Sequence, residues 1–142
     1  MRCLMNEPAL TGPVHIIGAG LIGTSIGLAL RRADIEVWLS DHNHEHVRTA
    51  SSLGAGVARP SEGSPQLVVV AVPPDHIGSV VVAALEEDPA AIVTDIGSVK
   101  CLPLTEVSDH VAPADLARFV GGHPMAGSER AGPLAASAEL FG

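Results

Sequence analysis

The chain has 142 residues, of which 46% are hydrophobic and 2% aromatic, and its 16 acidic and 8 basic residues give a formal net charge of -8 at pH 7. This size and hydrophobicity suit one folded domain with an aliphatic core, because tyrosine is absent and tryptophan occurs once. The acidic balance argues against nucleic-acid binding, and no apolar run approaches the roughly 18 residues that a membrane span needs.

The amino terminus and the cysteines indicate the cellular setting. The first thirteen residues lack the continuous apolar stretch of a signal peptide, so they are interpreted as an extension before a folded domain at residues 14–142. Cys3 and Cys101 lie far apart and indicate neither a disulfide framework nor a metal site. We therefore expect a cytoplasmic protein without a bound metal.

Apolar runs of strand length recur along the chain, with helix-like segments between them. The runs cover residues 14–17, 36–39, 67–72, 91–95 and 118–121, and a short edge strand is expected near Val57. The run from Leu67 to Val72 is apolar throughout, which is typical of a central strand buried on both faces. The alternation predicts an α/β fold, with a doubly wound, mainly parallel sheet that has helices on both faces.

Four helices are expected between these runs, at residues 21–32 and at about 43–53, 75–86 and 99–111. The first has apolar residues at helical spacing and should end near Ala33 and Asp34, because aspartate tolerates the left-handed conformation better than most residues. Pro103 falls early enough in the last helix to be tolerated in its first turn or so.

A glycine-rich turn joins the first strand to the first helix. Gly18, Gly20 and Gly23 form the sequence GAGLIG, in which they permit a tight turn, close approach of a pyrophosphate and close helix packing, respectively. The helix amino terminus adds free N–H groups and a partial positive charge. The pattern predicts a Rossmann-type dinucleotide site; a strand-to-helix turn without a ligand is the alternative. The predicted cofactor-binding residues are Gly18, Gly20, Leu21, Ile22, Gly23, Asp41, Val72 and Pro73.

Asp41 follows the second strand, 18 residues after Gly23, near the distance at which an acid hydrogen-bonds the adenosine ribose. Its carboxylate would repel a 2′-phosphate, which favours NAD over NADP; a helix cap or solvated loop acid is the alternative. The nearby His42, His44 and His46 could suggest a metal site. A solvated helix start explains them better, because no cysteine or carboxylate framework with ligand spacing accompanies them.

Three later segments combine polar and glycine residues near the ends of predicted strands: AVPPDH (71–76), TDIGSVK (94–100) and GGHPMAGSERAG (121–132). Together with GAGLIGTSIG (18–27), they resemble the prephenate and arogenate dehydrogenase family in order and spacing, from about Val14 to Gly142. GGHPMAGSE is the most specific part. Ligands bind at the carboxyl ends of strands in open parallel sheets, so these segments should converge beside the nicotinamide.

His123 is the predicted catalytic base, since glycines and a proline flank it and imidazole is easily poised at neutral pH; a structural histidine is the alternative. Ser98 offers a hydroxyl to a substrate oxygen or an imidazole, or else caps the next helix. Lys100 either anchors its loop through Asp95 or is solvated. The resemblance implies that Glu129 shapes or gates the substrate pocket, and an exposed acid is the alternative.

The resemblance implies NAD-dependent oxidative decarboxylation of prephenate to 4-hydroxyphenylpyruvate in tyrosine biosynthesis, with Ser98, His123 and Glu129 in the catalytic site. It also implies a largely helical second domain that forms a homodimer and supplies an arginine for the substrate. Because residue 142 precedes any such domain, we expect cofactor binding with weak or absent catalysis. Exposed apolar side chains at Leu134, Leu140 and Phe141 would indicate the surface that the domain covers.

Three other interpretations remain open at this point. Arogenate could be the substrate in place of prephenate. A 3-hydroxyacid dehydrogenase or imine reductase would share the glycine turn and the AVPP-like strand end, but would not explain GGHPMAGSE. The chain could also be a nucleotide-binding module without catalysis.

Overall fold

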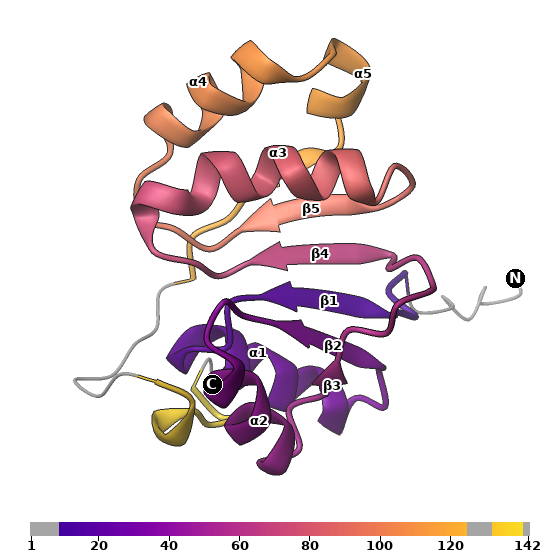
Figure 1. The fold of residues 1–142 in the computed structure, drawn as a ribbon, viewed down its shortest axis with the longest axis vertical. Helices are drawn as coiled ribbons and strands as arrows, with labels where there is room; N and C mark the ends of the chain where they lie inside the picture. Colours follow the sequence, from indigo (N-terminus) through magenta and orange to yellow (C-terminus); the bar gives the residue numbers. More distant parts are fainter. Residues whose placement is uncertain (1–8, 125–131, 141–142) are drawn as a thin grey trace, which may run out of the picture.

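The computed structural model describes residues 9–124 and 132–140, which build a six-stranded parallel sheet (Figure 1). The order across the sheet is β3-β2-β1-β4-β5-β6. This is the order of a doubly wound dinucleotide-binding sheet, so the predicted α/β Rossmann-type fold is confirmed. The strands are β1 (Val14–Ile17), β2 (Val37–Ser40), β3 (Val57–Ala58), β4 (Leu67–Val70), β5 (Ile92–Asp95) and β6 (Phe119–Gly121).

The helices follow the expected pattern with small shifts. They are α1 (Leu21–Arg32), α2 (His44–Ser52), α3 (Ile77–Glu87), α4 (Cys101–His110) and α5 (Pro113–Leu116), with 3₁₀ turns η1 (Pro74–His76) and η2 (Pro133–Ala135). Helix α1 has the predicted bounds, and Asp34 beyond it has a φ of 59°, which confirms the left-handed ending. The predicted helix at 75–86 starts too early, because η1 occupies its first two residues. None of the described helices is long and apolar enough to cross a membrane.

Two aliphatic clusters cover the two faces of the sheet. On one face Val69 of β4 packs with β1, β2 and the α1–α2 side, and on the other Val68 and Val70 pack with α3 and Val107 of α4. All three valines are at least 97% buried, which confirms that β4 is a central strand buried on both faces. Burial of these side chains is the main source of the sheet's stability.

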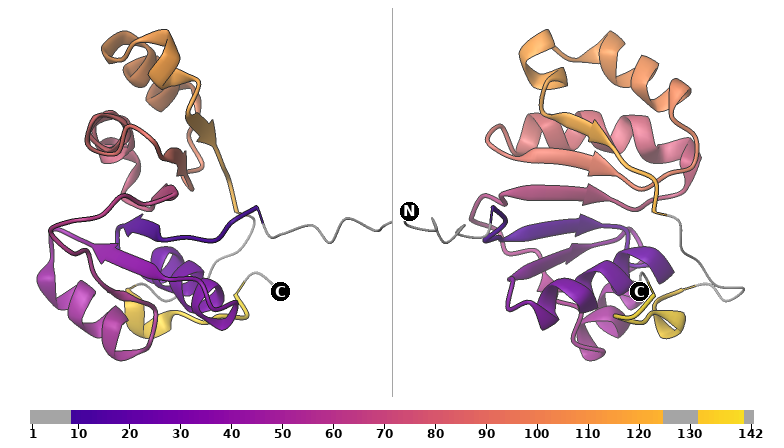
Figure 2. Two further views of the ribbon diagram at one scale, coloured as in Figure 1. Left: turned by 90° about the vertical axis from the view of Figure 1, so that its right-hand side faces the viewer. Right: turned by 180° about the vertical axis from the view of Figure 1, so that it is seen from behind.

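Strands β1 and β4 lie side by side at the centre of the sheet, with Ile17 opposite Val70. From β1 the chain turns to α1 on one face, and from β4 it turns to α3 on the other (Figure 2). The two connections therefore part at the carboxyl edge of the sheet, and such a switch point is where ligands bind in open α/β sheets.

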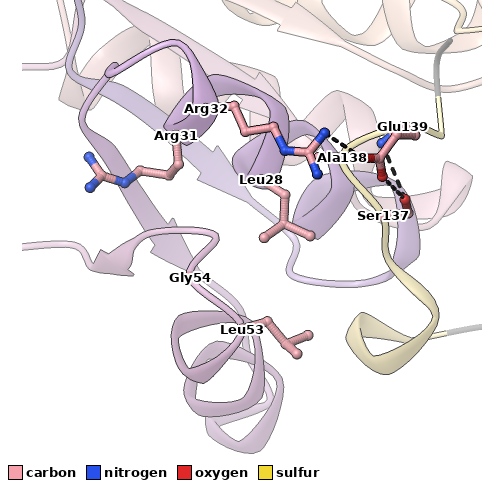
Figure 3. Close-up of a pocket in the computed structure, with 8 residues that line it drawn as sticks. All are labelled: Leu28, Arg31, Arg32, Leu53, Gly54, Ser137, Ala138 and Glu139. Atoms are coloured by element: carbon pink, nitrogen blue, oxygen red, sulfur yellow. Dashed lines mark hydrogen bonds and ion pairs between the residues drawn. The ribbon is translucent and has the colours of Figure 1, made fainter.

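After β6 the described chain resumes at residue 132 and packs against α1 and α2. The Ser137 N–H donates to Ser25 Oγ at 2.9 Å, and Arg32 pairs with Glu139 at the surface. Figure 3 shows Arg32, Ser137 and Glu139 among the residues around a hollow of about 550 Å³ at the end of α1. Of the three apolar residues expected at the surface, Leu134 is 79% exposed and Leu140 is half-buried, whereas Phe141 lies outside the described residues.

Candidate nucleotide-binding site

A cavity of about 800 Å³ lies at the switch point between β1 and β4. Its volume falls in the range of small-molecule and cofactor sites. Seven of the eight predicted cofactor-binding residues line it, and Gly23 does not: the seven are Gly18, Gly20, Leu21, Ile22, Asp41, Val72 and Pro73. The opposite wall comes from the start of α3 and from the loop after β5, with His76, Ser79, Val80, Ile96 and Gly97.

The three glycines of the turn have separate physical roles. Gly18 has a φ of 106°, and a Cβ there would lie 2.2 Å from the Ala71 carbonyl oxygen. A Cβ on Gly23 would lie 1.9 Å from the Gly18 carbonyl oxygen, so α1 can approach the turn only because this residue has no side chain. Gly20, in contrast, has no atom within 4 Å of its missing Cβ and faces the cavity. Gly18 and Gly23 serve the turn itself, whereas Gly20 leaves room for a ligand.

Helix α1 begins beside this open space. Its N-cap residue is Gly20, which has no side chain and therefore cannot accept a hydrogen bond from the N–H groups of the first turn. The first N–H groups of a helix need partners from outside it, and together with the helix dipole they favour an anion. A pyrophosphate in the cavity would meet both requirements.

Asp41 ties the glycine turn to the end of β2. Its side chain is only 7% exposed; Oδ2 accepts the Ala19 N–H and Oδ1 accepts the Asn43 N–H, each at 2.8 Å. The N-cap of α2 is Asn43, whose side chain accepts the Glu45 N–H, so Asp41 is not that helix's cap. A carboxylate oxygen can accept more than one hydrogen bond, so the Asp41 oxygens retain capacity for a ribose hydroxyl.

Two imidazoles flank the Asp41 carboxylate. His42 Nδ1 lies 3.4 Å from Oδ1 and His46 Nδ1 lies 3.6 Å from Oδ2, and both residues line the cavity. His44, between them in sequence, is exposed and is not part of the lining. Among the residues that the structure describes, no group of three histidine, cysteine or acidic side chains is arranged to hold a metal ion.

A buried polar network supports the end of β2 from the α3 face of the sheet. His15 of β1 is 97% buried; its Nε2 lies 2.7 Å from Ser40 Oγ and its Nδ1 2.8 Å from the Arg59 guanidinium. Arg59 also makes a two-pronged pair with Asp88 at 2.7 and 2.9 Å. Burial, with the positive charge of Arg59 as a second cause, lowers the pKa of His15 to about 4.

His15 is therefore neutral, and the donors around it fix its tautomer. Because arginine can only donate, Nδ1 accepts from Arg59 and Nε2 carries the proton donated to Ser40. This network was not predicted from the sequence. The one signal for it was a histidine inside an otherwise apolar strand, VHII.

The loop after β5, which contributes Ile96 and Gly97 to the cavity wall, lies next to the loop after β6. Asp95 pairs with Gly121, and the Gly122 N–H donates to the Asp95 carbonyl at 3.0 Å. The Asp95 side chain is 99% buried, and its Oδ2 accepts from Lys100 Nζ at 2.5 Å and from the Gly97 N–H at 3.0 Å. Of the two alternatives for Lys100, the loop anchor is confirmed. Oδ1 of Asp95 has no partner among the described residues.

The structure does not place the predicted catalytic residues that it describes in the lining of the cavity. Ser98 and His123 are exposed and neither lines the cavity, although Gly97, next to Ser98, does. Lys100, not Ser98, is the N-cap of α4, so the capping alternative for Ser98 is wrong. Glu129 lies outside the described residues. The catalytic roles of these three residues stay predictions.

Comparisons with known proteins agree with this arrangement. The family model described as "Prephenate dehydrogenase, nucleotide-binding domain" matches residues 26–142. The chain is 41% identical to "Probable prephenate dehydrogenase NovF" of Streptomyces niveus over 126 residues, which is 89% of this chain and 34% of that protein. It is 37% identical to the cyclohexadienyl dehydrogenase of Zymomonas mobilis over 139 residues, with 90% of this chain and 45% of that protein covered.

Among solved structures, the chain is similar to the prephenate dehydrogenase of A. aeolicus in complex with hydroxyphenyl propionate and NAD+. The TM-score is 0.75 and the identity 29%, over 90% of this chain and 46% of that one. The chain thus spans between a third and a half of the length of these relatives.

Proposed function

Because the chain belongs to the prephenate dehydrogenase family, through its nucleotide-binding domain, we propose that it binds NAD in the cavity between β1 and β4. The observation that carries this proposal is the conjunction of Gly20, the uncapped start of α1 and Asp41 along one wall of the cavity. The turn and helix end suit a pyrophosphate, and the carboxylate suits a ribose diol. The structure of the A. aeolicus relative, which is a complex with NAD+, supports the choice of cofactor.

We propose further that the whole protein carries out the oxidative decarboxylation of prephenate to 4-hydroxyphenylpyruvate, with this chain as its cofactor-binding half. Bound NAD would supply the hydride acceptor. His123 would accept the proton of the 4-hydroxyl group as hydride leaves C4, Ser98 would orient the two, and Glu129 would shape the substrate pocket. Loss of the ring carboxylate as CO2 then completes the aromatic ring.

The chain spans 34% and 45% of the lengths of these two relatives. We propose that a second, largely helical domain forms a homodimer, closes the pocket and supplies an arginine to the substrate. The cytoplasmic location expected from the sequence belongs to the same proposal.

The first test is direct binding of NAD by calorimetry, with Gly20→Ala as a matched variant. A methyl group on Gly20 meets no protein atom within 4 Å but enters the space proposed for the pyrophosphate. We expect at least a tenfold loss of NAD affinity, about 1.4 kcal/mol, with an unchanged melting temperature. Equal affinity in the two proteins would contradict the proposed site.

NADH formation from prephenate and NAD, with arogenate and NADP as comparators, separates catalysis from binding. Turnover would show that these 142 residues suffice for the reaction. NAD binding without turnover, both in this chain and in a form of the protein that includes the proposed helical domain, would favour a second candidate function, a nucleotide-binding module that lacks catalysis. The exposure of Ser98 and His123, away from the lining of the cavity, is the observation that keeps this second function in view.

A further inference from the structure

The end of the cavity around Asp41 contains two side chains that the proposed function does not use. His42 and His46 both line the cavity and lie 3.4 and 3.6 Å from the two oxygens of the Asp41 carboxylate. An NAD-specific site needs only the carboxylate and a place for the ribose. The presence of the two imidazoles beside Asp41 therefore needs a further explanation. The inference drawn from it rests on the proposed binding of NAD in this cavity.

The positions of the two histidines follow from how α2 begins. Asn43 caps the helix, which puts His42 just before the cap and His46 one turn later on the side that faces Asp41. The side chain of His46 is 40% exposed and that of His42 is 92% exposed. Both imidazoles are therefore accessible to a ligand in the cavity.

The other charged side chains nearby are already paired or equally exposed. Glu45 and Arg48 of α2 form an ion pair with each other at 2.9 Å, and both are largely exposed. His44 is exposed and is not among the residues that line the cavity. Among the described residues, Asp41 is thus the one acidic side chain that lines this cavity, beside two side chains that donate hydrogen bonds and can carry positive charge.

We propose that His42 and His46 form a binding pair for the 2′-phosphate of NADP, and that the Asp41 carboxylate alone keeps the affinity for NADP low. NADP differs from NAD by a phosphate on the 2′-hydroxyl of the adenosine ribose. This is the hydroxyl that an acid at this position recognises. A phosphate there is repelled by the carboxylate but accepts hydrogen bonds from the imidazoles. The discrimination between the two cofactors is the balance of these opposed terms.

Asp41→Asn is the variant that tests this balance most directly. It removes the negative charge at nearly constant shape, and its side-chain oxygen can still accept one of the two backbone N–H groups, of Ala19 or Asn43, that hold the carboxylate. We expect the Kd for NADP, measured by calorimetry, to fall at least tenfold, with little change or a modest weakening for NAD. Replacing His42 and His46 by alanine in the same background should reverse most of the gain.

His44→Ala provides the matched control, because this histidine lies in the same segment but outside the cavity lining. It should leave the affinities for NAD and NADP unchanged in either background. A gain in NADP affinity that survives the loss of both His42 and His46 would overturn the proposal, as would an equal loss on removal of His44.

A second comparison keeps the test valid if Asp41→Asn loosens the glycine turn, which a lowered melting temperature would reveal. In the background with Asp41 intact, His42→Ala with His46→Ala should weaken NADP severalfold more than NAD. Equal effects on both cofactors would overturn the proposal. Absence of NAD binding by the unaltered chain would instead refute the proposed function, so the two failures are distinguishable.

Discussion

The two sides of the carboxyl edge differ in how firmly the described residues fix them. On the side of β1 and β2, backbone contacts at Gly18 and Gly23 and two hydrogen bonds to Asp41 set the glycine turn in place. On the side of β5 and β6, Lys100 donates to Asp95 at the base of the loop. Ser98, which lies between them in the sequence, is exposed. We call the first the cofactor side and the second, after the predicted roles of Ser98 and His123, the catalytic side. Backbone and side-chain contacts hold the glycine turn in place, whereas Ser98 and His123 are exposed.

The difference shows how a nucleotide-binding domain divides its work. Binding a pyrophosphate and a ribose needs backbone groups and one carboxylate, which a single strand-turn-helix unit supplies. Aligning a base with a substrate needs side chains that are held on several sides. Ser98 and His123 have no such surroundings among the described residues. We therefore expect substitutions in the glycine turn to lower stability and NAD affinity, and substitution of His123 to lower turnover.

The largest effect is expected from Gly23→Ala on the cofactor side. The added methyl group would lie 1.9 Å from the Gly18 carbonyl oxygen, so the turn and α1 must move apart. We expect a loss of about 3 kcal/mol in the free energy of unfolding, together with loss of NAD binding. Urea unfolding measures the first and calorimetry the second. Gly20→Ala, which meets no protein atom, is the control; equal stability in both variants would show that the turn is not rigid.

His123→Asn tests the catalytic side and should separate turnover from binding. If His123 is the base, its removal should lower turnover by roughly 10²- to 10⁴-fold while the Kd for NAD stays within twofold. The assay requires a form of the protein that turns over prephenate. Parallel losses of turnover and NAD affinity would mean that His123 supports the fold or the cofactor site and not the chemistry.

The smallest effect concerns the buried network behind β2. The pKa of His15 falls from 6.5 to about 4 on folding, so between these values the unfolded chain binds more protons than the folded one. The stability from this group is complete above about pH 6.5 and is lost as the pH falls toward 4. Between pH 7 and pH 5 the loss should be about 2 kcal/mol.

Urea unfolding of the unaltered chain and of His15→Gln at both pH values isolates this contribution. The variant should lose most of the difference in pH dependence, whereas His44→Ala, an exposed histidine, should keep it. An unchanged dependence in His15→Gln would mean that other groups carry the acid sensitivity.

Local patterns in the sequence were enough to predict the alternation of strands and helices, the parallel sheet and the glycine turn. The roles of Gly18, Gly20 and Gly23 depend on residues only a few positions away, and the bounds of α1 follow from its own apolar spacing. The Asp95 and Lys100 pair was also within reach, because a single loop connects the two residues.

Contacts between distant side chains were not predictable in this way. His15 and Arg59 are 44 positions apart, and only the parallel pairing of β1 with β2, and of β2 with β3, brings them together. The exposure of Ser98 and His123 depends likewise on what covers a surface, which no periodicity in the chain encodes. Helix α5 was missed although Pro113 occupies its first position, because four residues are too few for a periodic signal.

The bond between Ser25 and Ser137 joins the helix of the glycine turn to a residue 112 positions later. Ser25 is fully buried, so its hydroxyl needs this partner, and Gly132 from the same late segment lines the nucleotide cavity. Contacts of such long sequence separation form late in folding. During synthesis on the ribosome, the glycine turn would emerge early. The cavity that it lines would become complete only after more than a hundred further residues, when Gly132 has been added.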